Sequence, residues 1–310
     1  MNWRRYFWPL VGLSAVAFSV WVLVGELRGI SVDDVWAGLG AIRPHRWMLA
    51  ALSGVAAYGA LAGYDHIALL HIRKRVSWLF VTLCSFTTYA LSHNIGGSVF
   101  SGAVIRYRAY GTRGLSGQDV GVLVAICWFT FILSTFLVSG VVLLLEPNLF
   151  DRFSDMGFTS LSTGAGIIML LLVAAYVFGS WLHFRPLRIG TFQLHYPRLP
   201  IVARQLIIGP IELLAAAAIL FFALPVEGNP GYLVVLGVFM VSFSAAQISH
   251  APGGLGVLEV VCLAGLSDMD QAGVVAALLV FRLIYLIVPL IIALFVVLLF
   301  ERSQFGRRTE

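Results

Sequence analysis

The sequence predicts an all-α polytopic membrane protein built from two inverted repeats, each with three transmembrane helices and one re-entrant helical hairpin. Of its 310 residues, 60% are hydrophobic and 11% are charged, which excludes an ordinary soluble domain. Several apolar runs reach the ~20 residues that a bilayer core requires. A short motif rich in glycine interrupts the apolar pattern once in each half of the chain.

The first apolar run covers about residues 7–24 and follows Arg4 and Arg5. It resembles a signal sequence, but it is long and no small-residue cleavage site follows, so we expect an uncleaved first span. In the polar stretch after it, Ser31 and Asp34 form a capping-box pattern that predicts the start of a short helix. That helix would either lie in the membrane interface or pack on its own protein.

The remaining spans fall into two matching sets. We expect the first repeat to cover 1–150 with a hairpin near 77–105, and the second to cover 151–310 with a hairpin near 232–266. The offset that superimposes the two glycine motifs also carries each span of the first repeat onto a span of the second, which supports an internal repeat. The expected spans after the first are 47–64, 120–145, 163–182, 206–224 and 272–299.

The two motifs explain why we expect broken helices. The first reads SHNIGG at 92–97 and the second reads SHAPGGLGVLE at 249–259. Glycine permits positive φ angles and close backbone approach, and Pro252 prevents a helix from simply continuing. Non-helical backbone at membrane depth is tolerated only when it is buried in protein or lines a wet cavity.

The loop charges favour hairpins over full crossings. If both motifs crossed the membrane, the basic 185–204 loop would lie outside and the acidic 146–155 loop inside, against the positive-inside rule. With re-entrant hairpins, both termini and the basic loops at 73–75, 106–113 and 185–204 are all cytoplasmic. Each half then has an odd number of crossings, which makes the halves inverted, a plan that recurs in transporters with the substrate site where the repeats meet.

The glycine motifs also predict a site for an anionic headgroup. A half-helix that starts at such a break presents free N–H groups and the positive end of its dipole to phosphate. Tight helix packing is the alternative explanation for the glycines. The residues that we expect at this site are Asn94, Gly96 and Gly97 in the first motif, and His250, Pro252, Gly253 and Gly254 in the second.

Arg282 lies near the middle of the last span, where an arginine costs ~3 kcal/mol and needs a partner. Glu212 and Glu259 are the available acids, and we expect Arg282 to pair with one of them at rest and to contact lipid phosphate during transport. A purely structural ion pair is the alternative. Arg106, after the first hairpin, would either capture phosphate or anchor the cytoplasmic side.

Other polar residues carry weaker signals. His93 and His250 occupy matching positions in the motifs and would either respond to protons or cap helices. Asp65, at the end of the second span, is expected to mark the interface. The three cysteines lie in apolar segments at unrelated spacings, so we expect small buried side chains rather than a disulfide or metal framework. No nucleotide-binding loop is present, and we expect no cofactor and no nucleic acid partner.

The string Pro252 to Val257, with Glu259 and Arg282 after it, resembles the lysylphosphatidylglycerol synthase transmembrane-region family, which includes flippase-like and YbhN-like membrane proteins. Asn94 to Gly97, followed by Arg106, is similar to that family's first motif. Larger members join this membrane region to a soluble synthase domain, which has no counterpart in this sequence. The resemblance therefore implies the translocation half of that architecture without the synthesis half.

The resemblance implies a lipid translocase, not an enzyme, in a bacterial inner membrane with both termini cytoplasmic. Its partners would be membrane lipids, either an anionic phospholipid or a polyprenyl-phosphate-linked lipid, and a homo-oligomer or a lipid-modifying enzyme partner stays open. Two other functions compete with it. One is a membrane-embedded transferase that uses Glu259 and His250, and the other is a non-catalytic partner of a lipid-modifying enzyme.

Overall fold

The computed structural model describes residues 31–95, 98–153, 159–182, 187–189, 192–194 and 196–306. The expected first span at 7–24 and the glycines Gly96 and Gly97 lie outside the described residues. The described chain is helical except for one antiparallel pair of short strands, β1 (Leu187–Ile189) and β2 (Phe192–Leu194). The prediction of an all-α membrane protein is confirmed.

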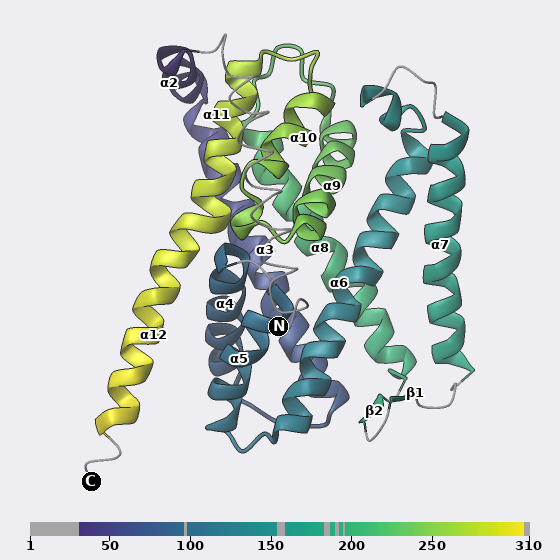
Figure 1. Ribbon diagram of the computed structural model, residues 1–310, viewed down its shortest axis with the longest axis vertical. Coiled ribbons are helices and arrows are strands. Elements are labelled where there is room, and N and C mark those ends of the chain that lie inside the picture. The colour runs from purple at the N-terminus through teal and green to yellow at the C-terminus, as the bar shows by residue number, and fades with distance from the viewer. Residues whose placement is uncertain are drawn as a thin grey trace, which may run out of the picture.

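The helices follow the predicted order (Figure 1). In the first half they are α2 (Val32–Ala41), α3 (Pro44–His71), α4 (Trp78–Ile95), α5 (Ser98–Gly111) and α6 (Gly117–Leu145). In the second half they are η2 (Leu149–Arg152), α7 (Thr159–Trp181), α8 (Leu199–Ala223), α9 (Tyr232–Ser249), η3 (Pro252–Gly254), α10 (Val257–Gly265), α11 (Gln271–Arg282), η4 (Leu283–Ile287) and α12 (Val288–Gly306).

Six described helices are long and apolar enough to cross a membrane, and five of them coincide with predicted spans. The sixth is α9, which the sequence assigns to the second hairpin. At 18 residues and about 1.5 Å per residue, α9 falls just short of a hydrocarbon core of about 30 Å. The six candidate spans are Pro44–His71, Gly117–Leu145, Ser160–Trp181, Leu199–Ala223, Tyr232–Ser249 and Gln271–Phe300.

Two helical hairpins occupy opposite ends of the bundle (Figure 1). α4 and α5 lie side by side at the end that carries β1 and β2, whereas α9 and α10 lie at the other end, and their tips approach each other near the middle. α3, α6 and α8 run past both hairpins. The inverted relation between the halves and the repeat boundary at residue 150 stay predictions.

The short helix α2 begins as its sequence predicts. The Ser31 hydroxyl accepts a hydrogen bond from the Asp34 N–H, and the Asp34 carboxylate accepts one from the Ser31 N–H. The helix packs against α11, where a Cβ on Gly38 would lie 3.1 Å from the Cβ of Ala276. Trp36 on another side of α2 is 68% exposed, so a position in the membrane interface stays a prediction.

The loops at the α9–α10 end are tied to each other within the second half. Arg152, which ends η2, donates to Asp268 at 2.9 Å and to the carbonyl of Gly265 at 3.0 Å. The hydrogen bond from Arg152 lowers the pKa of the Asp268 carboxyl. Since half of the Asp268 side chain is exposed, this ion pair contributes at most about 1 kcal/mol.

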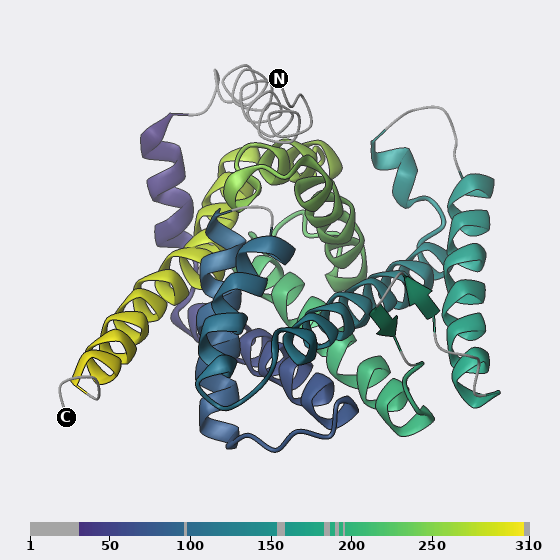
Figure 2. The same cartoon turned by 60° about the horizontal axis from the view of Figure 1, so that its bottom comes forward.

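The centre of the bundle depends on close backbone approach between long helices. α8 packs against α3 and α6, while α7 and α12 lie at opposite margins (Figure 2). A Cβ at Gly209 on α8 would lie 1.6 Å from the Oγ of Ser134 on α6. Small residues at such crossings let membrane helices pack backbone to backbone.

We expect Gly209→Ala to destabilise the protein by about 1–3 kcal/mol, because the extra methyl group would displace Ser134 from its place against α8. Gly59→Ala is the matched control, since nothing lies within 4 Å of a Cβ at this exposed helical glycine. The control should melt at or above the wild-type temperature in detergent, because alanine favours helix by about 1 kcal/mol over glycine. Equal melting temperatures for the two variants would contradict the close crossing.

The hairpin topology predicts a labelling pattern. Arg75→Cys and Arg113→Cys flank the first hairpin and should react with a membrane-impermeant thiol reagent from the same, cytoplasmic side. Glu227→Cys, which precedes α9, should react from the opposite side. The natural cysteines are buried, so they give little background. Labelling of the first two positions from opposite sides would mean that the α4–α5 segment crosses the membrane fully.

Candidate functional site

A cavity of about 430 Å³ lies where the two hairpins meet. Both hairpins line it, together with α3, α6, α8 and η4. Three lining residues, Trp128, Ile248 and His250, are exposed, so the cavity reaches the protein surface between α6 and the end of α9. Its polar lining residues include Ser92, His93, Arg106, Glu212, Gln247 and Tyr285.

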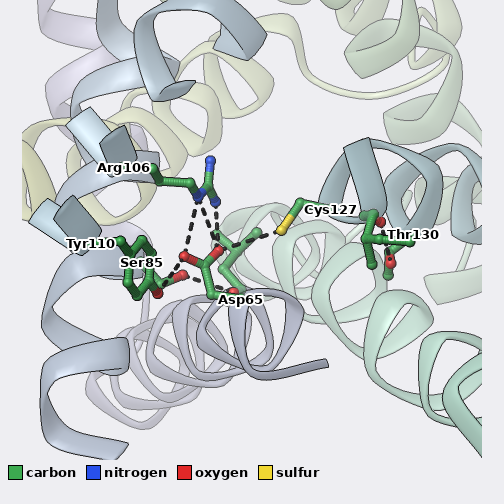
Figure 3. A network of polar contacts seen from close by, with 8 residues as sticks. Asp65, Ser85, Arg106, Tyr110, Cys127 and Thr130 are labelled. Atoms are coloured by element: carbon green, nitrogen blue, oxygen red, sulfur yellow. Dashed lines mark hydrogen bonds and ion pairs between the residues drawn. The ribbon is translucent and has the colours of Figure 1, made fainter. Parts of the chain in front are cut away.

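Arg106 on α5 is held by a buried carboxylate on α3 (Figure 3). Its Nη2 donates to Oδ1 of Asp65 at 2.6 Å, and its Nε lies 3.1 Å from Oδ2. The Tyr110 hydroxyl donates to the same Oδ2 at 2.9 Å, and the Sγ of Cys127 lies 3.5 Å from Oδ1. The guanidinium also lies 4.7 Å from the ring centroid of Tyr89, close enough for a cation–π interaction.

Asp65 therefore has a partner that its expected position at the interface does not account for. Its side chain is fully buried and it fixes the first hairpin to α3. The sequence could not show the pair, because Asp65 and Arg106 are 41 residues apart and belong to different helices. The signal that could have indicated it is the rule that a charge within a membrane-spanning segment needs a partner.

The tip of the second hairpin is built from left-handed backbone. His250, Gly253, Gly254 and Gly256 have φ angles of 55°, 61°, 63° and 78°, a region that glycine enters without the penalty of a Cβ. Several N–H groups at the tip already have partners. Gly254 donates to the carbonyl of Ala251, Leu255 to that of Pro252, and Gly256 to the Glu259 carboxylate. The N–H groups of Gly254, Leu255 and Gly256 are thus not free for phosphate in this conformation, unlike the expectation from the motif.

Arg282 pairs with Glu259, which is one of the two partners that the sequence proposed. The Nε of Arg282 donates to Oε1 of Glu259, and its Nη1 lies 3.3 Å from the carbonyl oxygen of Gly253. The other carboxylate oxygen accepts from the Gly256 N–H at 2.8 Å. One ion pair therefore neutralises a partly buried arginine, caps α10 and satisfies a carbonyl at the break. Nη2 of Arg282 is buried without a hydrogen-bond partner.

The segment after Arg282 is a five-residue π-helix, η4. Pro289 lacks the N–H that would bond the carbonyl of Tyr285 four residues earlier, and that carbonyl instead accepts from the Tyr58 hydroxyl at 2.9 Å. The Nδ2 of Asn94, at the end of α4, lies 3.2 Å from the carbonyl of Leu286. η4 thus contacts the first hairpin, while Arg282 just before it contacts the second.

Glu212 pairs with a tyrosine instead of Arg282. Its Oε1 accepts from the Tyr285 hydroxyl at 2.7 Å, and its Oε2 is buried with no hydrogen-bond partner. The two histidines of the motifs have different surroundings. His93 stacks on the Tyr285 ring at 5.3 Å between centroids, and its Nδ1 is buried without a partner. His250 is exposed, and its Nδ1 lies 2.8 Å from the carbonyl oxygen of Ile248.

The structure brings part of the expected site together. Five of the expected residues line the cavity, namely Arg106, Glu212, His250, Gly253 and Gly254. Asn94, Pro252, Glu259 and Arg282 are described but do not line it; Arg282 lies behind Gly253, whose Cβ position is 3.7 Å from its Nη1. The motifs did not indicate Asp65, Tyr89 or Tyr285. Within the described ranges, no group of three His, Cys, Asp or Glu side chains could hold a metal ion.

Comparison with protein families gives one match over nearly the whole chain. The family model for the lysylphosphatidylglycerol synthase TM region matches residues 10–293. Inner membrane protein YbhN of Escherichia coli is 29% identical over 97% of this chain and 94% of its own length. The protein slr0712 of Synechocystis is 27% identical over 90% of this chain and 87% of its own length.

A second group of relatives is larger. A phosphatidylglycerol lysyltransferase of Staphylococcus haemolyticus is 26% identical over 88% of this chain. The match covers only 31% of that protein's length. The similarity therefore concerns the membrane region and leaves most of the lysyltransferase without a counterpart in this chain.

The buried Asp65–Arg106 pair predicts how single and double substitutions change the stability of the protein. Asp65→Asn should destabilise the protein by about 3–5 kcal/mol, because it leaves the Arg106 guanidinium buried without a countercharge. The double variant Asp65→Leu, Arg106→Met should recover most of that loss, since replacing both charges of a buried pair with apolar side chains is often neutral. Thermal melting in detergent measures both effects. A double variant that is no more stable than Asp65→Asn would contradict the pairing.

Proposed function

Because the chain belongs to the lysylphosphatidylglycerol synthase transmembrane-region family, we propose that it moves a phospholipid or lipid-linked headgroup between membrane leaflets. It makes and breaks no covalent bond in that lipid. The observation that carries the proposal is the cavity of about 430 Å³ between the two hairpin tips, with Arg106 in its wall. The cavity has the size of a ligand site, and it lies at the midlevel of the bundle.

The opening of the cavity suits a lipid. A headgroup would occupy the polar interior, while its acyl chains leave through the side opening lined by Trp128 and Ile248 and stay in the bilayer. The acyl chains then stay in hydrocarbon while the headgroup crosses, so they never enter a polar environment. Inner membrane protein YbhN, a relative over nearly its full length, supports placing the chain in a bacterial inner membrane, and the loop charges favour cytoplasmic termini.

Arg106 supplies a reason for the site to take phosphate. A guanidinium binds carboxylate and phosphate with the same planar geometry, so a lipid phosphate would compete with Asp65 for the same donors. An anionic phospholipid and a polyprenyl-phosphate-linked lipid both offer that phosphate. Arg282 would contact the lipid phosphate after Glu259 releases it. Its Nη2 already lacks a hydrogen-bond partner.

The two other functions have less support. A transferase that uses Glu259 needs a free carboxylate, but this one is held by Arg282 and by the Gly256 N–H. A scaffold without transport does not require a polar cavity at membrane depth, which is costly to maintain. Translocation uses the cavity, the charged pair beside it and the side opening together.

The test is headgroup flipping in proteoliposomes that contain labelled phosphatidylglycerol or, separately, a labelled polyprenyl-phosphate lipid. Val124→Trp on α6 fills the cavity and should slow flipping about tenfold or more, equivalent to about 1.4 kcal/mol in the barrier. Val141→Trp on the same helix is the matched control, since Val141 is 40% exposed and does not line the cavity. Loss of flipping in Val124→Trp but not in Val141→Trp supports a path through the cavity.

Two further variants test the second hairpin. Gly253→Leu places a side chain where φ is 61°, at a cost of about 1–2 kcal/mol, and Arg282→Ala leaves Glu259 without its partner. Both should lose flipping, whereas Gly59→Leu and Arg152→Ala, which lie away from the cavity, should keep it. If folded wild-type protein flips neither lipid, the translocase proposal is wrong and an enzyme or scaffold function takes its place.

A further inference from the structure

The Glu212 carboxyl is unusual among the buried acids of the bundle. It is 2% exposed, lies within the span Leu199–Ala223 and lines the cavity. One oxygen accepts from Tyr285, and the other has no partner. Within the part of the chain that the structure describes, no Lys, Arg or His forms an ion pair with it.

The neighbouring elements offer hydroxyl groups but no free cation to Glu212. Arg106 on α5 lines the same cavity but is held by Asp65. His250 belongs to the second hairpin and contacts the carbonyl of Ile248. The other titratable groups on this side are Tyr64 on α3, Tyr89 and His93 on α4, Cys127 on α6 and Tyr285 on η4, all in the cavity wall, and Tyr58 on α3, which bonds the carbonyl of Tyr285.

The contrast with Asp65 and Glu259 is informative. Each of these two acids binds an arginine, which supplies a countercharge. A carboxylate without a countercharge is far more costly at membrane depth than a neutral carboxyl, because nothing replaces its lost hydration. Glu212 is therefore suited to carry a proton in the conformation described here.

We propose that Glu212 binds and releases a proton in each transport cycle, so that a phosphate headgroup and a proton cross the membrane together. The inference rests on the proposed function. A neutral carboxyl can donate a hydrogen bond from its free oxygen to a phosphate in the cavity. An ionised carboxylate has no donor and repels the phosphate. Binding of the headgroup and binding of the proton therefore favour each other.

The same contacts link Glu212 to both hairpins. Tyr285, which bonds Glu212, belongs to the π-helix η4, and such segments often occur at functional sites. Asn94 at the first tip bonds the carbonyl of Leu286 in η4, and Arg282 before η4 bonds Glu259 and Gly253 of the second tip. A change at Glu212 thus acts on η4, which contacts the first tip and directly follows the Arg282 that contacts the second.

The experiment imposes a difference of one pH unit across proteoliposomes that contain labelled phosphatidylglycerol, with the membrane potential clamped to zero. With one proton per lipid, wild-type protein should accumulate the label about tenfold in the leaflet on the alkaline side. Glu212→Gln, which cannot release a proton, should leave whatever label it moves evenly distributed between the leaflets. Glu212→Asp, which keeps the carboxyl, should restore accumulation, and vesicles without protein should show none.

The outcomes separate this inference from the proposed function. If wild-type protein flips the label but ignores the gradient, or if Glu212→Gln accumulates it like wild type, the coupling is wrong. If a His93→Gln variant alone loses accumulation, the proton site is His93 and the assignment to Glu212 is overturned. If wild-type protein flips no label, the proposed function fails first.

A readout that needs no transport tests the proton site directly. Infrared spectra of wild-type protein in lipid should contain the band of a protonated buried carboxyl at neutral pH, and the band should disappear as the pH is raised. The band should be missing from Glu212→Gln and retained in the control Glu227→Gln, a loop residue. Absence of the band in wild-type protein at neutral pH would overturn the proposal.

Discussion

The fold depends on a carboxylate partner for each of two arginines inside the helical bundle. Arg106 binds Asp65 and Arg282 binds Glu259, and each pair joins one hairpin to a long helix. Neither hairpin spans the bundle, so neither can be held by length alone as a full transmembrane helix is. An ion pair that costs several kcal/mol to break holds each hairpin in place. The cavity lies where the two tips meet, next to Gly253 and His93.

The same two arginines show how irregular backbone survives in this environment. Broken helices expose carbonyl and N–H groups that hydrocarbon cannot satisfy. At the second tip, Arg282 bonds the carbonyl of Gly253 while its partner Glu259 accepts from the N–H of Gly256. The glycines supply the left-handed backbone and the ion pair supplies the missing hydrogen bonds. Each would be costly without the other.

Sequence reasoning located the long described helices and the two hairpins, and it named Glu259 as one of two candidate partners of Arg282. Hydropathy, glycine spacing and the cost of a buried charge are all visible locally in the sequence. It missed Asp65 because a carboxylate near the end of an apolar run looks like an interface residue until its partner on another helix is known. It also missed Tyr285. Because Pro289 has no N–H, the carbonyl of Tyr285 is free to accept a hydrogen bond from Tyr58. Such long-range pairings are set by packing, which periodicity does not record.

Oε2 of Glu212 lacks a hydrogen-bond partner, and the arginines near it are already paired with other acids. Both arginines beside the cavity have carboxylate partners, so the charges balance before Glu212 is counted. Adding a carboxylate would leave the site with a net negative charge, which is unfavourable both for its own solvation and for binding phosphate. Adding a neutral carboxyl leaves the balance intact and provides a donor. The pairing of Asp65 and Glu259 with arginine is thus what makes the third acid suited to exchange a proton with solvent.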